Sequence, residues 1–193
     1  DTLFTLKVVD IPKNVAAEKL AKLIDYYPWD SIKNELAHLA NKTPSIHDVL
    51  KFIAAPARLE FLIALAIKSK LPTVKVIPNY PCDDEGLPTS TAGGNLGDIE
   101  CFETTNNILV EVTMAEGRQQ TMMEVWPIAR HMAEFKEKYE CNHPQCIFVA
   151  PSVFADTKDQ IDWVKDRKKL FIRPYRIADF INYIESAVSL YYQ

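Results

Sequence analysis

The chain has 193 residues, of which 25% are charged and 48% hydrophobic, with a formal net charge of −4 and a pI of about 5.6. This composition is that of an ordinary globular protein. The acidic balance speaks mildly against a self-sufficient nucleic-acid-binding domain, which usually carries a basic surplus. No run of about 18 apolar residues occurs, so we expect no transmembrane helix and no membrane partner.

The start of the chain shows no basic stretch followed by an apolar core, so we expect no secretory signal. The first residue is Asp1 rather than Met, and we expect the sequence to be a piece of a longer chain. The four cysteines are too few for a disulfide scaffold at this length, so a reducing, cytoplasmic setting is expected.

Residues 1–55 are predicted to form an N-terminal helical segment of linker or packing helices, followed by the main domain at 56–193. The first helix is expected around residues 15–27, with a second at 30–40 and Asp30 as its N-cap. The first helix carries its apolar residues on one face: Val15, Leu20, Leu23 and Ile24. Residues 45–54 are expected to add a short helix.

From Pro56 the pattern predicts a buried helix over 56–70, apolar on nearly all sides, with proline in its first turn. A loop rich in Pro, Gly, Asp and Ser then leads to two strands at 98–103 and 107–113. The next helix is expected over 119–139, interrupted by Pro127.

The last third of the chain is predicted to alternate between strand and helix: a central strand at 146–151, a helix at 156–169, a strand at 170–174 and a helix at 176–192. This order predicts an α/β protein with a mixed central sheet flanked by helices. The glycine-rich phosphate-binding motifs of nucleotide-binding folds are absent from the sequence.

The two predicted strands at 98–113 carry an unusual number of acids. With a turn centred on Thr105 and Asn106, Asp98 would lie opposite Thr113 and Glu100 opposite Glu111. Asp98 and Glu111 would then be diagonal neighbours about 7–8 Å apart at the backbone. Carboxylates at this spacing can converge on one Mg²⁺ or Mn²⁺ ion, which binds oxygen ligands.

The alternative is an acidic hairpin edge that faces solvent. Two features favour the metal site. Leu109, Val110 and Val112 make the second strand apolar, which favours burial of Glu111. The loop before Asp98 is rich in glycine, as backbone often is where a ligand approaches closely.

The residues of this region carry a resemblance to a known family. Asp98, followed after twelve residues by Glu111-Val112-Thr113, resembles the PD-(D/E)xK nuclease core with Thr in place of its lysine. The longer stretch "GDIECF…ILVEVTMAEGRQQTMMEVWPIARH" resembles the catalytic domain of AlwI-like type IIS restriction endonucleases, a group with relatives that nick one strand. The similarity spans roughly residues 56–150.

The resemblance implies a restriction-endonuclease-like fold and a Mg²⁺-dependent deoxyribonuclease, with Mn²⁺ able to replace Mg²⁺. It also implies a set of catalytic residues: Glu60, Asp98, Glu111, Thr113, Glu124 and His131. The expected metal ligands among them are Asp98, Glu111 and Glu60. Glu124 and His131 are seven residues apart and are expected on one helical face, with Gln120 one turn earlier.

Thr113 at the lysine position changes the expected chemistry. A hydroxyl carries no positive charge and is no base near neutral pH, so it can only orient water. Proton removal would then depend on the metal ion, assisted by His131, whose pKa range suits acid–base work.

The resemblance also implies partners: double-stranded DNA, a sequence-recognition domain outside this fragment, and a second nuclease subunit or a transient dimer. Basic residues at 167–169, with Arg173 and Arg176, are candidates for phosphate contacts. Two rivals stay open, a repair-type nuclease of the same core and a non-catalytic DNA-associated dimerisation module. Cys141, His143 and Cys146 are too few for a zinc site, so we expect a plain loop there.

Overall fold

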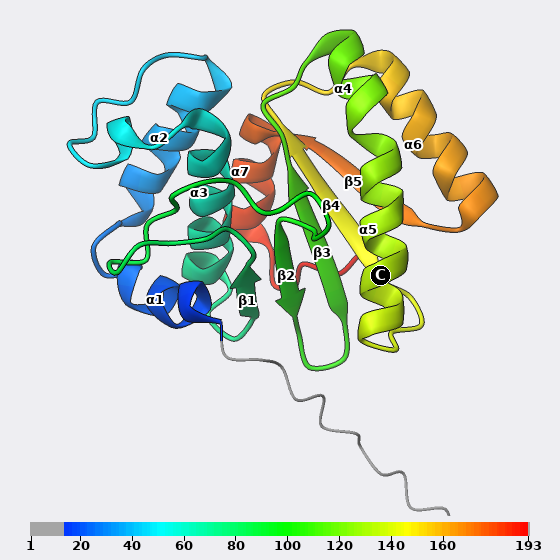
Figure 1. Cartoon of the computed structure of the whole chain (residues 1–193), viewed down its shortest axis with the longest axis horizontal. Helices are drawn as coiled ribbons and strands as arrows, with labels where there is room; N and C mark the ends of the chain where they lie inside the picture. Colours follow the sequence, from blue (N-terminus) through cyan, green and yellow to red (C-terminus); the bar gives the residue numbers. More distant parts are fainter. Residues whose placement is uncertain (1–13, 193) are drawn as a thin grey trace, which may run out of the picture.

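A mixed five-stranded sheet in the order β1-β2-β3-β4-β5 forms the centre of the molecule. The computed structural model describes residues 14–192 and is shown in Figure 1. Strands β1 (Lys75–Pro78), β2 (Ile99–Phe102) and β3 (Asn107–Val112) are antiparallel neighbours. Strands β4 (Gln145–Ala150) and β5 (Phe171–Arg176) continue the sheet in parallel with β3. The predicted mixed sheet is confirmed, and β1 is a strand that the sequence pattern did not reveal.

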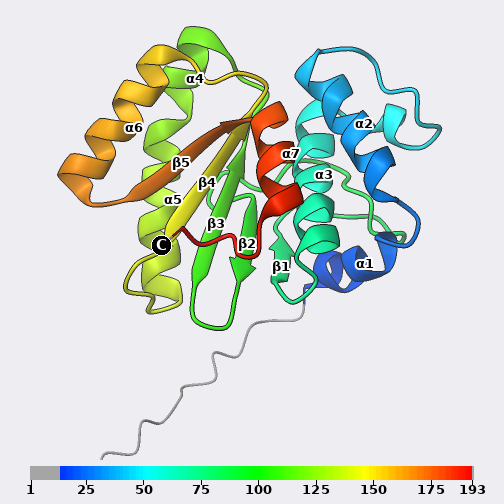
Figure 2. The same cartoon turned by 180° about the vertical axis from the view of Figure 1, so that it is seen from behind.

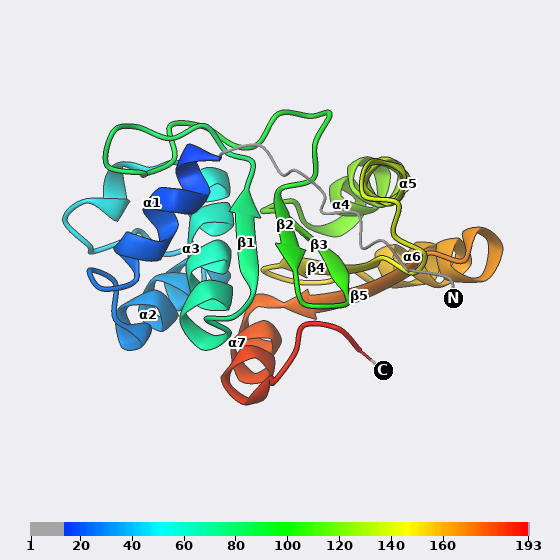
Figure 3. The same ribbon diagram turned by 90° about the horizontal axis from the view of Figure 1, so that it is seen from below.

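Helices cover both faces of this sheet (Figures 2 and 3). On one face lie α3 (Ala55–Lys70) and α7 (Ile177–Ser186), and on the other α5 (Val125–Lys138) and α6 (Ala155–Lys168). Because side chains alternate along a strand, β3 sends Ile108 and Val110 into the first core and Leu109 into the second.

The N-terminal helices α1 (Val15–Leu23) and α2 (Trp29–Ala40) pack on α3 and contribute to the same core as the first sheet face. The boundary predicted at residue 55 stays a prediction, and residues 1–13 lie outside the described part of the chain. The N-cap prediction for Asp30 was wrong. Pro28 takes that position, since its extended backbone precedes the helix and its carbonyl accepts from Ser31 and Ile32.

Three helix predictions differ from the structure in extent. In place of a helix at 45–54 there is only a 3₁₀ turn, Leu50–Phe52. The helix expected over 119–139 is divided into α4 (Gly117–Met123) and α5, because Pro127 has no N–H to donate to the carbonyl of Met123. The final helix ends at Ser186, and the backbone of Tyr192 instead exchanges hydrogen bonds with the side chain of Gln145.

The register of the β2–β3 hairpin differs by two residues from the prediction. Glu100 pairs with Leu109, so the same register continued sets Asp98 opposite Glu111. The turn lies one residue earlier than expected, because the N–H of Glu103 bonds to the carbonyl of Asn106 and leaves Thr104 and Thr105 as the loop. Asp98 and Glu111 are therefore direct rather than diagonal neighbours across the hairpin.

No helix within residues 14–192 combines the length and apolar character that crossing a membrane requires.

Candidate functional site

A cavity of about 460 Å³ opens at the carboxyl end of β3, between the first half of α3, residues 91–92 and α4. Its wall contains four of the six predicted catalytic residues: Glu60, Asp98, Thr113 and Glu124. We refer to it as the acidic cavity, because no Lys, Arg or His lies among its lining residues. Three carboxyl groups thus share one space with no positive partner.

Glu60 enters this cavity from α3, a helix that is otherwise almost entirely buried. Its residue surface is only 3% exposed, and its Oε2 accepts a hydrogen bond from the N–H of Ala92 at 2.9 Å. Burial raises the pKa of Glu60 to about 7, and the negative charge of Glu111 adds to the effect, while the Ala92 bond opposes it. Glu60 is therefore a carboxyl poised near neutral pH.

Asp98 lies directly before β2 and faces the same cavity. Its Oδ2 accepts from the N–H of Val112 at 2.7 Å, which fixes the side chain across the end of the hairpin. Burial raises the pKa of Asp98 well above its usual range, and repulsion from Glu111 and Glu60 raises it further. A cation bound nearby would lower the pKa of this carboxyl.

Thr113 and Glu124 form a hydrogen-bonded pair on the opposite wall. The Thr113 hydroxyl donates to Glu124 Oε1 at 2.9 Å and accepts from the N–H of Ala115 at 3.0 Å. A hydroxyl has one proton and two lone pairs, so one acceptor position on Thr113 stays available. Glu124 occupies the break between α4 and α5, and burial raises its pKa.

Glu111 and His131 form a second layer that does not line the acidic cavity. His131 Nδ1 lies 2.9 Å from Glu111 Oε1, and Nε2 lies 3.3 Å from the carbonyl oxygen of Gly94. With acceptors at both ring nitrogens, the hydrogen bond to Glu111 raises the pKa of His131 and favours the imidazolium. Burial raises the pKa of Glu111, while His131 and the backbone N–H of Asp98 lower it.

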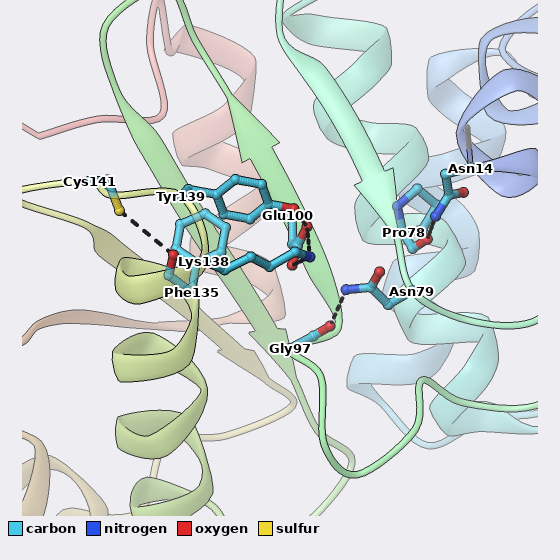
Figure 4. Close-up of polar contacts among 9 residues, drawn as sticks. All are labelled: Asn14, Pro78, Asn79, Gly97, Glu100, Phe135, Lys138, Tyr139 and Cys141. Carbon is cyan, nitrogen blue, oxygen red and sulfur yellow. Dashed lines mark hydrogen bonds and ion pairs between the residues drawn. The ribbon is translucent and has the colours of Figure 1, made fainter. Parts of the chain in front are cut away.

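Residues 93–97, which we call the glycine segment, pass over this second layer. A Cβ on Gly97 would lie 2.4 Å from Leu109 Cδ1 and 2.9 Å from Glu111 Oε1, so a larger residue there would require these two side chains to move. Asn79 donates to the carbonyl of Gly97 at 2.7 Å (Figure 4), and Arg130 donates to that of Gly94 at 3.2 Å. The backbone of Gly97 therefore lies close to Glu111, while the close approach of a ligand to these glycines stays a prediction.

Glu100 shares a sheet face with Asp98 and Glu111 but has different partners. Its carboxylate accepts from Tyr139 Oη at 2.5 Å and from Lys138 Nζ at 3.0 Å (Figure 4). The residue is only 5% exposed. Glu100 is thus a neutralised structural acid that lies outside the acidic cavity.

Gln120 has a supporting role that its place in the helical stripe did not reveal. Its amide donates to the carbonyls of Ala115 and Ser152 and accepts from the N–H of Phe154, at 3.0, 2.8 and 3.0 Å. Gln120 is fully buried and ties the loop after Thr113 to the loop after β4. The sequence had placed Gln120 only on the helical stripe of Glu124 and His131, which gave no sign of these backbone contacts.

Two groups of candidate residues are engaged elsewhere. Arg173 bonds to Tyr175, Tyr183 and the Leu190 carbonyl, and Arg176 pairs with Asp179 at 2.7 Å, while the phosphate contacts expected of these residues stay a prediction. Cys146 is fully buried in β4, and within residues 14–192 no group of three His, Cys, Asp or Glu side chains is close enough to hold a metal ion. The expected loop lies between α5 and β4, and Cys146 falls within β4 rather than in the loop.

The sequence matches the AlwI restriction endonuclease family over residues 7–183. The chain belongs to this family. Among solved structures it is similar to the small subunit (R.BspD6I2) of the heterodimeric restriction endonuclease R.BspD6I, with a TM-score of 0.66 and 21% sequence identity over 80% of this chain and 76% of that chain. At this identity the likeness shows the fold alone. No curated protein sequence matches the chain significantly.

The resemblance read from the sequence is thereby confirmed at the level of the AlwI family, and the fold is restriction-endonuclease-like as expected. The family match begins before residue 55, so the N-terminal helices belong to the matched region. Restriction endonucleases of this family act on DNA.

Proposed function

We propose that this chain is a metal-dependent DNA endonuclease domain, the cleavage module of a type IIS restriction or nicking enzyme. The observation that carries the proposal is the acidic cavity, where Glu60, Asp98 and Glu124 lie together without a basic side chain. Uncompensated carboxylates in one buried space destabilise a folded protein. Such a set is retained where a bound cation offsets the repulsion.

The donor set fits Mg²⁺, with Mn²⁺ able to replace it. Asp98 and Glu60 would hold the ion from the cavity, and Glu111, directly across the hairpin from Asp98, is the third proposed ligand. Mg²⁺ is commonly held by one or two carboxylates, with waters and substrate phosphates completing its octahedron. A complete cage of three protein ligands is therefore not required before DNA binds.

The bound ion would stabilise charge on the scissile phosphate and increase the acidity of the attacking water. Thr113 orients this water, because its hydroxyl already donates to Glu124 and can accept one more hydrogen bond. Glu124, whose pKa is raised by burial, is the proton acceptor nearest to Thr113. His131 acts through Glu111, which it holds by the hydrogen bond between Nδ1 and Oε1.

This assignment makes the chain a PD-(D/E)xK nuclease in which the Thr113–Glu124 pair replaces the lysine. The net charge of −4 offers little general attraction to DNA, which supports reliance on a separate sequence-recognition domain for affinity. The similar R.BspD6I2 is a subunit of a heterodimer, which supports a second nuclease subunit as the partner for cutting both strands.

The decisive experiment separates metal binding from cleavage. Wild-type protein, Asp98→Asn and Glu111→Ala are titrated with Mn²⁺ by calorimetry and then assayed on supercoiled plasmid with Mg²⁺. We expect metal binding and plasmid nicking in the wild type, and loss of both in Asp98→Asn with an unchanged circular dichroism spectrum. Glu100→Gln, an acid-to-amide change two residues after Asp98 but outside the cavity, is the matched control and should cut normally.

Two outcomes would contradict the proposal. If Glu111→Ala nicked plasmid as fast as the wild type, the proposed metal site would be ruled out. If the wild-type protein neither bound metal nor cut DNA when the recognition domain was supplied, the chain would be a non-catalytic dimerisation module. Cleavage of damaged or methylated DNA alone would instead identify a repair-type nuclease.

A further inference from the structure

Two exposed tryptophans pack against each other on the outer side of α5 and α6. Trp126 and Trp163 are 45% and 46% exposed, and their rings meet edge to face with centroids 5.5 Å apart. Met122, four residues before Trp126, is 78% exposed on α4, which is joined to α6 by a hydrogen bond between Thr121 and Thr157. Large apolar side chains gathered in this way mark an interaction surface.

The charge of α6 argues for a protein partner rather than nucleic acid. Acidic and basic side chains along α6 are equal in number, and Asp159 and Asp162 flank Trp163. Phosphate groups require a local surplus of Lys and Arg, which α6 does not provide. Aromatic residues are enriched at the centres of protein–protein interfaces, where charged residues form the rim.

The pattern on α6 is self-complementary. Asp159, Trp163 and Arg167 are spaced by four residues, so they form one ridge along the helix, and all three are exposed. When two copies of α6 pack antiparallel about a two-fold axis at Trp163, Asp159 of each copy faces Arg167 of the other. Asp166 then faces Gln160, whose amide N–H groups can donate to a carboxylate. Among residues 14–192 neither Asp159 nor Arg167 forms an ion pair within the chain.

We infer that this face, formed by Trp126, Trp163 and the Asp159–Arg167 ridge, docks a second copy of the same chain through an antiparallel α6–α6 contact. The two-fold symmetry follows from the ridge, since an isologous interface requires each surface patch to complement itself. A contact made mainly by one helix from each copy forms a weak dimer, and we expect a dissociation constant on the order of 10–100 µM. Association would place two acidic cavities in one assembly, as cutting both strands requires.

The test measures association without DNA or metal, so its failure is distinguishable from failure of the proposed cleavage chemistry. Sedimentation velocity over a concentration series gives the dimer dissociation constant for each variant. Asp159→Arg and Arg167→Asp each place like charges opposite each other twice in the dimer, and each should weaken it at least about tenfold. The double variant Asp159→Arg/Arg167→Asp restores opposite charges and should recover the wild-type constant.

Two matched controls make the test specific. Asp162→Arg makes the same charge change on the same helix but off the ridge, and Phe52→Ala removes an 82% exposed aromatic from a distant turn. Neither should change the dissociation constant, whereas Trp163→Ala should weaken it. A wild-type chain that stays monomeric at several hundred micromolar overturns the inference. So does a double variant that fails to recover, or a Trp163→Ala variant that loses DNA binding while dimerising normally.

Discussion

Asp98 and Glu100 are two residues apart on the same face of the same hairpin, yet their surroundings are opposite. Glu100 is matched by the ammonium of Lys138 and the hydroxyl of Tyr139, at 3.0 and 2.5 Å. Asp98 has one backbone N–H at 2.7 Å, and the other charged groups in its cavity are carboxyls. The charge of Glu100 is thus balanced by side chains of the protein, whereas the carboxyl of Asp98 is available to a ligand.

This difference distinguishes structural acids from functional ones better than burial does. Both side chains are enclosed by protein, and both lie beside β3. The pKa values of Asp98 and Glu60 are raised by burial and, in addition, by repulsion from neighbouring carboxyl groups. Raised carboxyl pKa values in a cleft indicate a site where a cation or a proton is exchanged.

The largest expected effect is that of the Asp98→Asn substitution on the rate of DNA cleavage. The amide keeps the size of the side chain and its acceptor for Val112 but removes the charge that would hold the metal ion. Since metal stabilisation of a phosphoryl transition state is worth several kcal/mol, we expect the cleavage rate to fall by about a thousandfold or more. Single-turnover cleavage of plasmid with saturating Mg²⁺ measures this. A loss below about tenfold would assign the metal to other residues.

The next effect is on stability, through Glu60→Gln. The pKa of Glu60 is raised from 4.5 to about 7 in the folded protein. The folded state therefore binds this proton more tightly than the unfolded state, and stability is lost as pH rises from about 4.5 to 7. Glutamine does not titrate and still accepts from Ala92. In metal-free buffer the variant should thus be more stable than the wild type by about 3 kcal/mol above pH 7, and similar to it near pH 4.

Urea unfolding at pH 4.5 and pH 8 in EDTA measures the difference between the two proteins, because the other titrating groups are common to both. Adding Mg²⁺ at pH 8 should stabilise the wild type more than Glu60→Gln, since bound cation offsets the repulsion only where the charge exists. Parallel stability curves for the two proteins would mean that Glu60 has an ordinary pKa.

The sequence pattern predicted the acidic β2–β3 hairpin and its flanking helices because their signals are local. The apolar run of α3, the alternation of β3 and the break caused by Pro127 each depend on neighbours within one element. The family resemblance added Glu60, which is remote in sequence from the hairpin, and also the roles of Thr113 and Glu124. Together these were enough to bring Glu60, Asp98, Thr113 and Glu124 to one cavity.

What the pattern missed depends on contacts between elements. The hairpin register shifted because the Glu103–Asn106 bond, and not composition, sets the turn. The pairing of Glu111 with His131 in a separate layer follows from the glycine segment, whose path no periodicity encodes. The balancing of Glu100 by Lys138 likewise requires α5 to pack beside β2, 38 residues along the chain.

A smaller effect is expected for Thr113→Val, which removes the hydroxyl that orients water and leaves Glu124 without its donor. We expect kcat to fall by about ten- to a hundredfold, with KM for DNA and affinity for Mn²⁺ unchanged. Thr113→Ser keeps the hydroxyl and should retain most of the activity. Steady-state cleavage gives kcat and KM of both variants, and calorimetry gives their affinity for Mn²⁺. Equal cleavage rates for Thr113→Val and Thr113→Ser would mean that Thr113 has no part in the mechanism.

The smallest effect is expected for Glu100→Gln, the balanced acid of the pair compared above. Glutamine still accepts from Tyr139, and Lys138, which is 47% exposed at its side chain, can turn to solvent. The free energy of unfolding should therefore fall by only about 1 kcal/mol, with cleavage and Mn²⁺ affinity unchanged. If Glu100→Gln instead abolished cleavage while remaining folded, the presence of a balancing partner would not distinguish structural from functional acids on this hairpin. The site would then extend beneath the glycine segment towards Lys138.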